Sequence, residues 1–251
     1  MTAFSANLGF LWTDCALPEA IRAAKRAGFA AVECHSPYDV PAEDVRAVLL
    51  ETGLPLLALN TTRGGQGAMG RAASPGQESE ARADIDQAIA YAEAVDAAAI
   101  HVLAGHGSGP ENAAVFVRNL RYATEATDRR ILIEPLNSHD APGYFLQTTD
   151  QAEAVLAAVQ APNLRLMFDC YHVARTEGDV RARLQRLLPV IGHIQVASVP
   201  DRGRPDQGEL DYLPILAFLA EQGWTHPIGA EYAPRGPTEP TLGWMRTLAH
   251  P

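Results

Sequence analysis

The sequence RILIEPLN at residues 130–137 places an acidic residue directly after a run of apolar side chains. Ile131, Leu132 and Ile133 follow one another without a polar interruption, which is typical of a strand covered on both faces in a parallel sheet. Pro135 has no N–H group for a sheet ladder, so the strand is expected to end beside it. Glu134 would therefore lie at the carboxyl end of a strand, where parallel α/β folds hold their functional residues.

The rest of the chain repeats the same unit, a strand followed by a helix. We expect strands at residues 4–8, 30–34, 54–60, 98–104, 130–136, 164–171, 191–197 and 227–232. We expect helices at residues 17–27, 42–51, 78–95, 111–127, 149–159, 180–188, 212–222 and 240–248. Eight such units without a Ser/Gly-rich linker predict a single-domain (β/α)8 TIM barrel of the α/β class over residues 1–251. The alternative is an open doubly wound sheet, but the segment SANLGF lacks its Gly-rich fingerprint.

The composition is that of an ordinary globular protein with an excess of acidic side chains. Hydrophobic residues make up 47% and charged residues 20%, and the net charge is −10. Nucleic acids and anionic membranes attract basic surfaces, so neither is an expected partner. The three cysteines show no paired metal-binding spacing, which favours reduced thiols. No secretory leader or apolar run of membrane-spanning length is recognised, so we expect a cytoplasmic location.

In the expected barrel, four successive strands end in side chains that carry oxygen. They are Glu134, Asp169, Gln195 and Glu231, on the fifth to the eighth strand. Three carboxylates brought together with no Arg or Lys among them would repel one another, so we expect a cation between them. Ligands that all bind through oxygen favour a hard divalent ion, Mg²⁺ or Mn²⁺, over Zn²⁺ or Cu²⁺.

Glu134 and Glu231 are expected to face each other across the mouth of the barrel. In that geometry, one carboxylate can remove a proton from a substrate carbon while the other returns it. A divalent ion holding a carbonyl and the adjacent hydroxyl would lower the pKa of the C–H group and stabilise an enediolate. This chemistry needs no redox step, and the sequence has no nicotinamide or flavin fingerprint, so we expect no nucleotide cofactor.

Several segments, spread in order along nearly the whole chain, resemble those of a known family. They are FSANL, EARADID, IHVLAG, LIEPLN, FDCYH, GHIQVASVPDRGRPDQGELDY and GAEYAPRG. These motifs are similar to those of the hydroxypyruvate isomerase family, within the xylose isomerase-like TIM barrels. The resemblance implies a metal-assisted aldose–ketose isomerase that interconverts hydroxypyruvate and 2-hydroxy-3-oxopropanoate (tartronate semialdehyde). It also implies that the two glutamates are the acid–base pair and that the ion is held by Glu134, Asp169, Gln195 and Glu231.

Other functions on related scaffolds stay open as alternatives. Close relatives isomerise 2-oxo-tetronates and more distant ones epimerise ketoses at C3, so the substrate is a small hydroxy-oxo acid or a sugar. A barrel endonuclease acting on abasic DNA would need more histidines around several Zn²⁺ ions, and a basic surface. A binding barrel without activity is disfavoured by the intact pair of glutamates. Exposed helices of such barrels often pair, so a homo-oligomer is also considered.

Further side chains are expected to contact the substrate: His172, His101, Arg202, Asn60 and Glu209. By the resemblance, His172 lies just above the metal and can donate a hydrogen bond to a substrate oxygen. His101 projects from the fourth strand toward the mouth. Arg202 follows the seventh strand and can bind a substrate carboxylate through two hydrogen bonds, with Glu209 ordering its loop.

Some neighbouring residues receive lesser or structural roles. Arg204 and Arg235 are weaker candidates for the carboxylate, and Asn7 is a candidate for the pocket lining. His193 is expected to point away from Gln195 and to be structural. The Gly-rich segment 61–75 is too long for an ordinary connector and is expected to be a functional or mobile loop.

Two positions depart from the pattern of the family that the chain resembles. Ala233 stands where the family usually has Lys after the Glu-Tyr pair of the last strand. The glycine loop reads Gly67-Ala68-Met69-Gly70 where similar proteins often carry a Trp. Both changes affect how a substrate carboxylate is held, so they bear on substrate identity.

Overall fold

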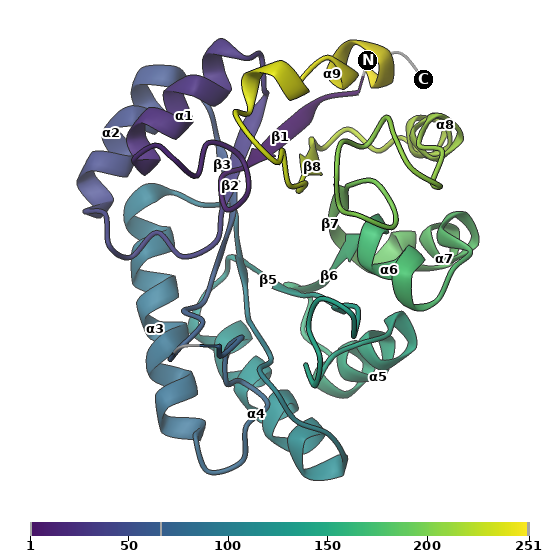
Figure 1. Ribbon diagram of the computed structural model, residues 1–251. Helices are drawn as coiled ribbons and strands as arrows, with labels where there is room; N and C mark the ends of the chain where they lie inside the picture. The colour runs from purple at the N-terminus through teal and green to yellow at the C-terminus, as the bar shows by residue number, and fades with distance from the viewer. Residues whose placement is uncertain (1, 66, 250–251) are drawn as a thin grey trace.

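A computed structural model describes residues 2–65 and 67–249, which form a closed barrel of parallel strands (Figure 1). The strands pair in chain order, and the last pairs with the first. The predicted (β/α)8 barrel is thereby confirmed. The strands are β1 (Phe4–Asn7), β2 (Ala31–Cys34), β3 (Leu56–Asn60), β4 (Ala99–His101), β5 (Arg130–Ile133), β6 (Leu164–Asp169), β7 (Ile191–Val196) and β8 (Ile228–Ala230).

Helices cover the outside of the barrel between successive strands, as Figure 1 shows. They are α1 (Leu17–Arg26), α2 (Ala42–Thr52), α3 (Glu78–Val95), α4 (Pro110–Ala126), α5 (Thr149–Val159), α6 (Cys170–Thr176), α7 (Val180–Leu187), α8 (Leu213–Glu221) and α9 (Trp244–Leu248). Short 3₁₀ turns lie at η1 (Leu188–Val190) and η2 (Glu239–Thr241). None of these helices is long and apolar enough to cross a membrane in the part of the chain described.

One helix of the structure was not predicted, and one predicted helix is shorter than expected. Helix α6 is not predicted from the sequence, and it begins at once after β6 because the Asp169 side chain accepts a hydrogen bond from the Tyr171 N–H at 2.9 Å. The helix expected at 240–248 begins only at Trp244. Before it, the Thr241 hydroxyl donates to the Thr238 carbonyl at 2.7 Å, a local bond that favours a turn over a helix.

Alternation along the strands separates an inner from an outer face. On β5, Ile131 and Ile133 belong to the main hydrophobic core between the sheet and the helices. Between them, Leu132 lies in a separate cluster made by neighbouring strands, with Ala58, Ala99 and Met167. These four side chains fill part of the barrel interior. Glu134, two residues after Leu132, and Asp169, two after Met167, therefore share the inner face.

The Gly-rich segment 61–75 is anchored along its second half, and residue 66 within it lies outside the described residues. Gly70 forms a β-bridge with Ala104, and the Ala73 N–H donates to the Ala104 carbonyl at 2.7 Å. Arg71 pairs with Asp84 of α3 at 2.8 Å. The expectation that this segment is functional or mobile stays a prediction, but its second half is tied to the loop after β4 and to α3.

The end of the chain packs against the start of the barrel through Trp244. This side chain is fully buried, with its ring centroid 4.8 Å from that of Phe4 and 6.0 Å from that of Tyr232. Its indole N–H donates to the Tyr232 hydroxyl at 3.2 Å. Helix α9 thus covers β1 and β8, the two strands whose pairing closes the barrel.

Replacing Trp244 with alanine is expected to lower the free energy of unfolding by about 3–5 kcal/mol, because it leaves a large cavity in a packed core. Urea denaturation followed by circular dichroism measures the change. Leu50 is 66% exposed on α2, so Leu50→Ala serves as the control and should change stability by less than about 0.5 kcal/mol. Equal losses in the two variants would contradict this account of closure.

Candidate active site

The four oxygen-bearing side chains predicted at the strand ends lie at one end of the barrel. Asp169 and Gln195 are register partners on β6 and β7, while Glu134 and Glu231 follow directly after β5 and β8. All four are more than nine-tenths buried. The inner face of four neighbouring strands therefore presents three carboxyl groups and one amide.

Most of the predicted site residues line one cavity of about 180 Å³ at this end. Its lining includes Glu134, Glu231, His172, His101, Arg202 and Asn60. A smaller cavity beneath it is shared by Glu134 and Glu231 with Gln195 and Asn7. The structure therefore brings together the expected acid–base pair and all but one of the expected substrate contacts.

Glu209 is the predicted residue that the structure places elsewhere. It is exposed, and its backbone N–H donates to the Val199 carbonyl at 2.8 Å. It lines a separate cavity beside α7 and α8. The weaker candidates Arg204 and Arg235 pair with Asp206 at 2.6 Å and with Asp201 at 3.2 Å. Neither arginine is among the residues that line the cavity of the glutamates.

Arg202 lies among the carboxylates, which corrects the expectation that no Arg or Lys would be there. Its Nη2 atom is 2.8 Å from Glu231 Oε1 and 3.4 Å from Asp169 Oδ2. The guanidinium lies over the rings of Phe10 and Tyr171, at 4.6 and 5.1 Å from their centroids. The backbone of Arg202 has a φ of 55°, in the left-handed region, and it is held by hydrogen bonds to the Ser198 carbonyl at 2.9 Å and from the Ala233 N–H at 2.8 Å.

Burial and neighbouring charges separate the titration of the two glutamates. Burial raises the pKa of Glu134 well above its usual range, and the negative charges of Glu231 and Asp169 raise it further. Burial also acts to raise the pKa of Glu231, but Arg202 and His35 outweigh it and lower that pKa to about 2. Burial raises the pKa of Asp169 to about 7, although Arg202 opposes the change. The protein alone thus leaves the negative charge around Glu134 uncompensated.

His172 is oriented by a backbone group. The Asn137 N–H donates to His172 Nδ1 at 3.1 Å, so this nitrogen must be an acceptor. Burial, assisted by Arg202, lowers the pKa of His172 to about 3, which leaves a neutral ring with its proton on Nε2. That Nε2 atom lies 3.6 Å from Asp169 Oδ2 and 3.9 Å from Glu134 Oε1. His172 therefore presents a hydrogen-bond donor to the cavity.

His101 is also neutral and faces Glu134. Burial lowers its pKa to about 3, and its Nδ1 atom is 3.6 Å from Glu134 Oε2. Its Nε2 atom is buried and has no hydrogen-bond partner among the described residues. Because a buried polar atom is costly to leave unpaired, this nitrogen is available to a bound molecule.

Sequence reasoning missed Glu33, which orients Gln195 from below. Glu33 Oε2 accepts a hydrogen bond from Gln195 Nε2 at 2.8 Å, and Glu33 Oε1 accepts one from Ser5 Oγ at 2.6 Å. Since the amide nitrogen is held by Glu33, the amide oxygen of Gln195 is directed elsewhere, and it is buried without a partner among the described residues. An acidic residue one position before the end of β2 is the only sequence signal for this role.

The orientation predicted for His193 was wrong. Residues two apart on a strand lie on the same face, so His193 and Gln195 both point inward. His193 Nε2 lies 3.0 Å from both oxygens of Glu33. The predicted structural role agrees with this contact, since His193 and Gln195 hold the same carboxylate.

His35, which follows β2, is a second residue that sequence reasoning missed. Its Nε2 atom is 3.5 Å from Glu231 Oε1, on the carboxyl group that Arg202 also contacts. The ring packs on Gly9, where a β-carbon would lie 2.2 Å from His35 Nδ1, and against the edge of Phe10. Only the position just after a strand end hints at this contact.

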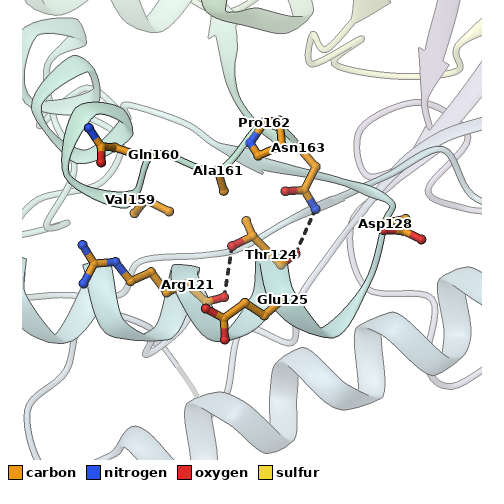
Figure 2. A pocket seen from close by; sticks show the side chains of 9 residues that line it. All are labelled: Arg121, Thr124, Glu125, Asp128, Val159, Gln160, Ala161, Pro162 and Asn163. Atoms are coloured by element: carbon orange, nitrogen blue, oxygen red, sulfur yellow. Dashed lines mark hydrogen bonds between the residues drawn. The ribbon is translucent and has the colours of Figure 1, made fainter.

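A larger cavity of about 590 Å³ lies at the other end of the barrel (Figure 2). It is formed by the end of α4 and by the loop between α5 and β6, which precede the amino ends of their strands. In this cavity Asn163 Nδ2 donates to the Thr124 carbonyl at 3.1 Å. The same nitrogen donates to the Thr127 carbonyl at 2.9 Å. These bonds hold the loop in place, and the candidate site residues lie at the opposite end.

Comparison with known proteins places this geometry in a family. The chain belongs to the xylose isomerase-like TIM barrel family, which it matches over residues 21–248. It is 39% identical to 2-oxo-tetronate isomerase of Cupriavidus necator, over 98% of each chain. It is 38% identical to a Homo sapiens protein named "Putative hydroxypyruvate isomerase", over 97% of this chain and 94% of that one. These relatives identify the chain as an enzyme of the isomerase class.

Solved structures show the same barrel. A Brucella melitensis protein described as AP endonuclease, family 2, superposes with a TM-score of 0.94 at 34% identity, covering 98% of this chain and 99% of that one. D-allulose 3-epimerase from Methylomonas sp. superposes with a TM-score of 0.78 at 19% identity, covering 99% and 91%. The second likeness shows the fold alone.

Gly229 of β8 tests the packing beneath the site. A β-carbon there would lie 2.5 Å from Glu33 Oε1 and 2.7 Å from Gln195 Cγ. Gly229→Ala is expected to lower stability by about 1–3 kcal/mol, because these buried side chains have little room to move. Gly243→Ala is the matched control, since a β-carbon there meets nothing within 4 Å. Thermal unfolding of both variants measures the difference, and equal stability would show that the Glu33 network can yield.

Proposed function

We propose that the protein is a metal-dependent aldose–ketose isomerase acting on a small 2-oxo acid with a hydroxyl group on C3. The reaction with hydroxypyruvate would move one proton from C3 to C2 and one from the C3 hydroxyl to the C2 oxygen, through an enediolate, and yield 2-hydroxy-3-oxopropanoate. The observation that carries the proposal is that Glu134 and Glu231, from β5 and β8, are buried yet line the same small cavity. No net oxidation occurs, so no nucleotide cofactor is invoked.

The residues at the strand ends fit a divalent cation. Glu134 Oε1 and Gln195 Oε1 are buried oxygens without a hydrogen-bond partner among the described residues, as expected of atoms kept for a ligand. Ligand atoms of Glu134, Asp169 and His172 lie within 4.8 Å of one another. His172 carries its proton on the nitrogen that faces this point, so we assign it a donor role and give the fourth position to an oxygen. The proposed ligands are Glu134, Asp169, Gln195 and Glu231.

The ion would supply a positive charge that acidifies the C–H group beside a bound carbonyl. Mg²⁺ or Mn²⁺ is proposed because the donors are oxygens. Glu134 and Glu231 are assigned to carry the proton between the two carbons. Arg202 and His35 hold the carboxylate of Glu231 in place. The Nε2–H of His172 and the side chain of Asn60 are positioned to bind substrate oxygens, and the burial of the site limits access of water to the carbanion.

The size of the cavity favours a short substrate. Its volume of about 180 Å³ is below the roughly 300–1,000 Å³ of pockets for drug-sized ligands. A three- or four-carbon acid suits it, in keeping with relatives named for hydroxypyruvate and for 2-oxo-tetronate. A 2-oxo-tetronate is therefore the alternative substrate. A ketose 3-epimerase has weaker support, because the solved epimerase shares the fold at only 19% identity.

The remaining expectations stay predictions. The acidic net charge of −10 disfavours DNA as a substrate, although a structure at 34% identity is described as an endonuclease. A cytoplasmic location and a homo-oligomer are likewise predicted from the sequence. None of them enters the chemistry proposed for the site.

Replacing either glutamate with glutamine is expected to lower turnover of hydroxypyruvate by at least about 10²–10⁴-fold, because the amide cannot carry the proton. Proton NMR in D2O follows deuterium incorporation into the substrate. Glu221→Gln, at the exposed end of α8, is the matched control and should exchange at the wild-type rate. Retained isomerisation of hydroxypyruvate in Glu134→Gln or Glu231→Gln, with an intact circular dichroism spectrum, would contradict the assigned roles.

Removal of divalent ions by EDTA is expected to abolish isomerisation, and Mn²⁺ or Mg²⁺ should restore it. An ion that binds only the native state also stabilises it, by about 2.7 kcal/mol at 100 times its Kd. Differential scanning calorimetry should therefore show a higher melting temperature with the ion in wild-type protein and a smaller rise in Asp169→Asn. Full activity after chelation, with no change in melting temperature, would argue against a metal-dependent enzyme.

A further inference from the structure

We propose that Arg63, in the loop after β3, binds the carboxylate of the substrate and so selects 2-oxo acids over neutral sugars. The inference rests on the proposed function, because it assigns one end of the substrate of that same site. Arg63 lines the cavity of about 180 Å³ together with Glu134, Glu231 and His172. From the sequence, Arg202 was expected to bind this carboxylate, but the two arginines differ in their partners.

Arg202 is already neutralised by the protein. It contacts Glu231 at 2.8 Å, Asp169 at 3.4 Å and, through Nη1, Asp140 at 3.9 Å. Its Nε also donates to the Glu231 carbonyl at 3.4 Å, and two aromatic rings flank the guanidinium. A substrate carboxylate at Arg202 would have to compete with three fixed carboxylates, two of them fully or nearly fully buried.

Arg63 has the opposite environment. Within the described residues, its guanidinium makes neither an ion pair nor a hydrogen bond, although it borders an acidic cavity. Its backbone is nevertheless held, because the Arg63 carbonyl accepts a hydrogen bond from the Gly70 N–H at 2.9 Å. Gly70 itself has a φ of +88° and lies so close to Leu103 that a β-carbon would be 2.3 Å from Leu103 Cβ. The loop therefore fixes the backbone of Arg63, while its exposed guanidinium has no partner among the described residues.

The charge balance of the cavity indicates what that free end binds. Glu134, Glu231 and Asp140 line the cavity, and Asp169 adjoins it through Arg202. When ionised, these four carboxyl groups exceed by one charge the combined positive charge of Arg202 and the proposed divalent ion, so a further cation favours an anionic substrate. A planar guanidinium binds a carboxylate through two parallel hydrogen bonds. A carboxylate bound at Arg63 would leave the adjacent carbonyl and hydroxyl in the cavity that Glu134 and Glu231 also line. A neutral ketose would leave Arg63 without a partner.

Kinetics with two substrates test this assignment. Hydroxypyruvate and dihydroxyacetone have the same three carbons and differ in a carboxylate against a hydroxymethyl group. Arg63→Gln is expected to lower kcat/KM for hydroxypyruvate roughly 10–100-fold, mainly through KM, because charge-assisted hydrogen bonds are lost. Turnover of dihydroxyacetone should stay within about 2-fold. Arg63→Lys should recover part of the loss, because it restores the charge without the two-pronged geometry.

Arg118→Gln is the matched control, since it removes the same charge from an exposed site on α4 and should leave both substrates unaffected. Calorimetry of the metal-loaded protein with tartronate, an unreactive hydroxy acid, gives a second measure, and Arg63→Gln should weaken its binding by a similar factor. Unchanged constants in Arg63→Gln, equal losses on both substrates, or no binding of tartronate to the wild type would overturn the inference. Binding of tartronate through Arg63 without turnover of hydroxypyruvate would instead reject the proposed function alone.

Discussion

The burial of several carboxyl groups at one end of a barrel is the constraint on which the active site depends. Transfer of a carboxylate out of water costs several kcal/mol unless partners replace the lost hydration. Arg202 compensates Glu231, whereas burial still raises the pKa of Asp169 to about 7 despite a backbone N–H and Arg202. Glu134 has one oxygen without a partner among the described residues, and its pKa rises through burial and the neighbouring negative charges. This imbalance is the physical basis for the cation proposed at the site.

The strand-end residues were predictable because two simple periodicities place them. Apolar runs identify the strands, and the two-residue repeat fixes which side chains face inward. Glu134 and Asp169 each follow an inner apolar residue by two positions, and both were found where expected. The same repeat contradicts the orientation predicted for His193, so that error lay in applying the rule and not in the sequence. Fold and inner face thus follow from local pattern alone.

The contacts missed from the sequence all depend on closure of the barrel or on loop geometry. Glu33 of β2 reaches Gln195 and His193 of β7 across the interior, a pairing of residues about 160 positions apart that no local pattern encodes. Arg202 lies in a loop with a left-handed backbone and meets carboxylates from β6 and from the end of β8. His35 meets Glu231 only because β1 joins β2 to β8. The contacts of these residues depend on tertiary structure. The sequence alone therefore shows separate charged residues, whereas in the structure they contact one another.

The division between barrel and loops explains how one scaffold serves several substrates. The side chains inside the barrel are tightly constrained. Gly229 has no room for a side chain beside Glu33, and Asp169 both ends β6 and caps α6. A change there disturbs packing, capping and charge together. Arg63 and Met69 line the same cavity from a connecting segment, where a substitution alters the fit to the far end of a ligand without moving the glutamates. Isomerases with this barrel that are named for three- and four-carbon acids are therefore expected to differ first in these connecting segments. Ala233 lies in another connecting segment, after β8, where its N–H donates to the Arg202 carbonyl at 2.8 Å.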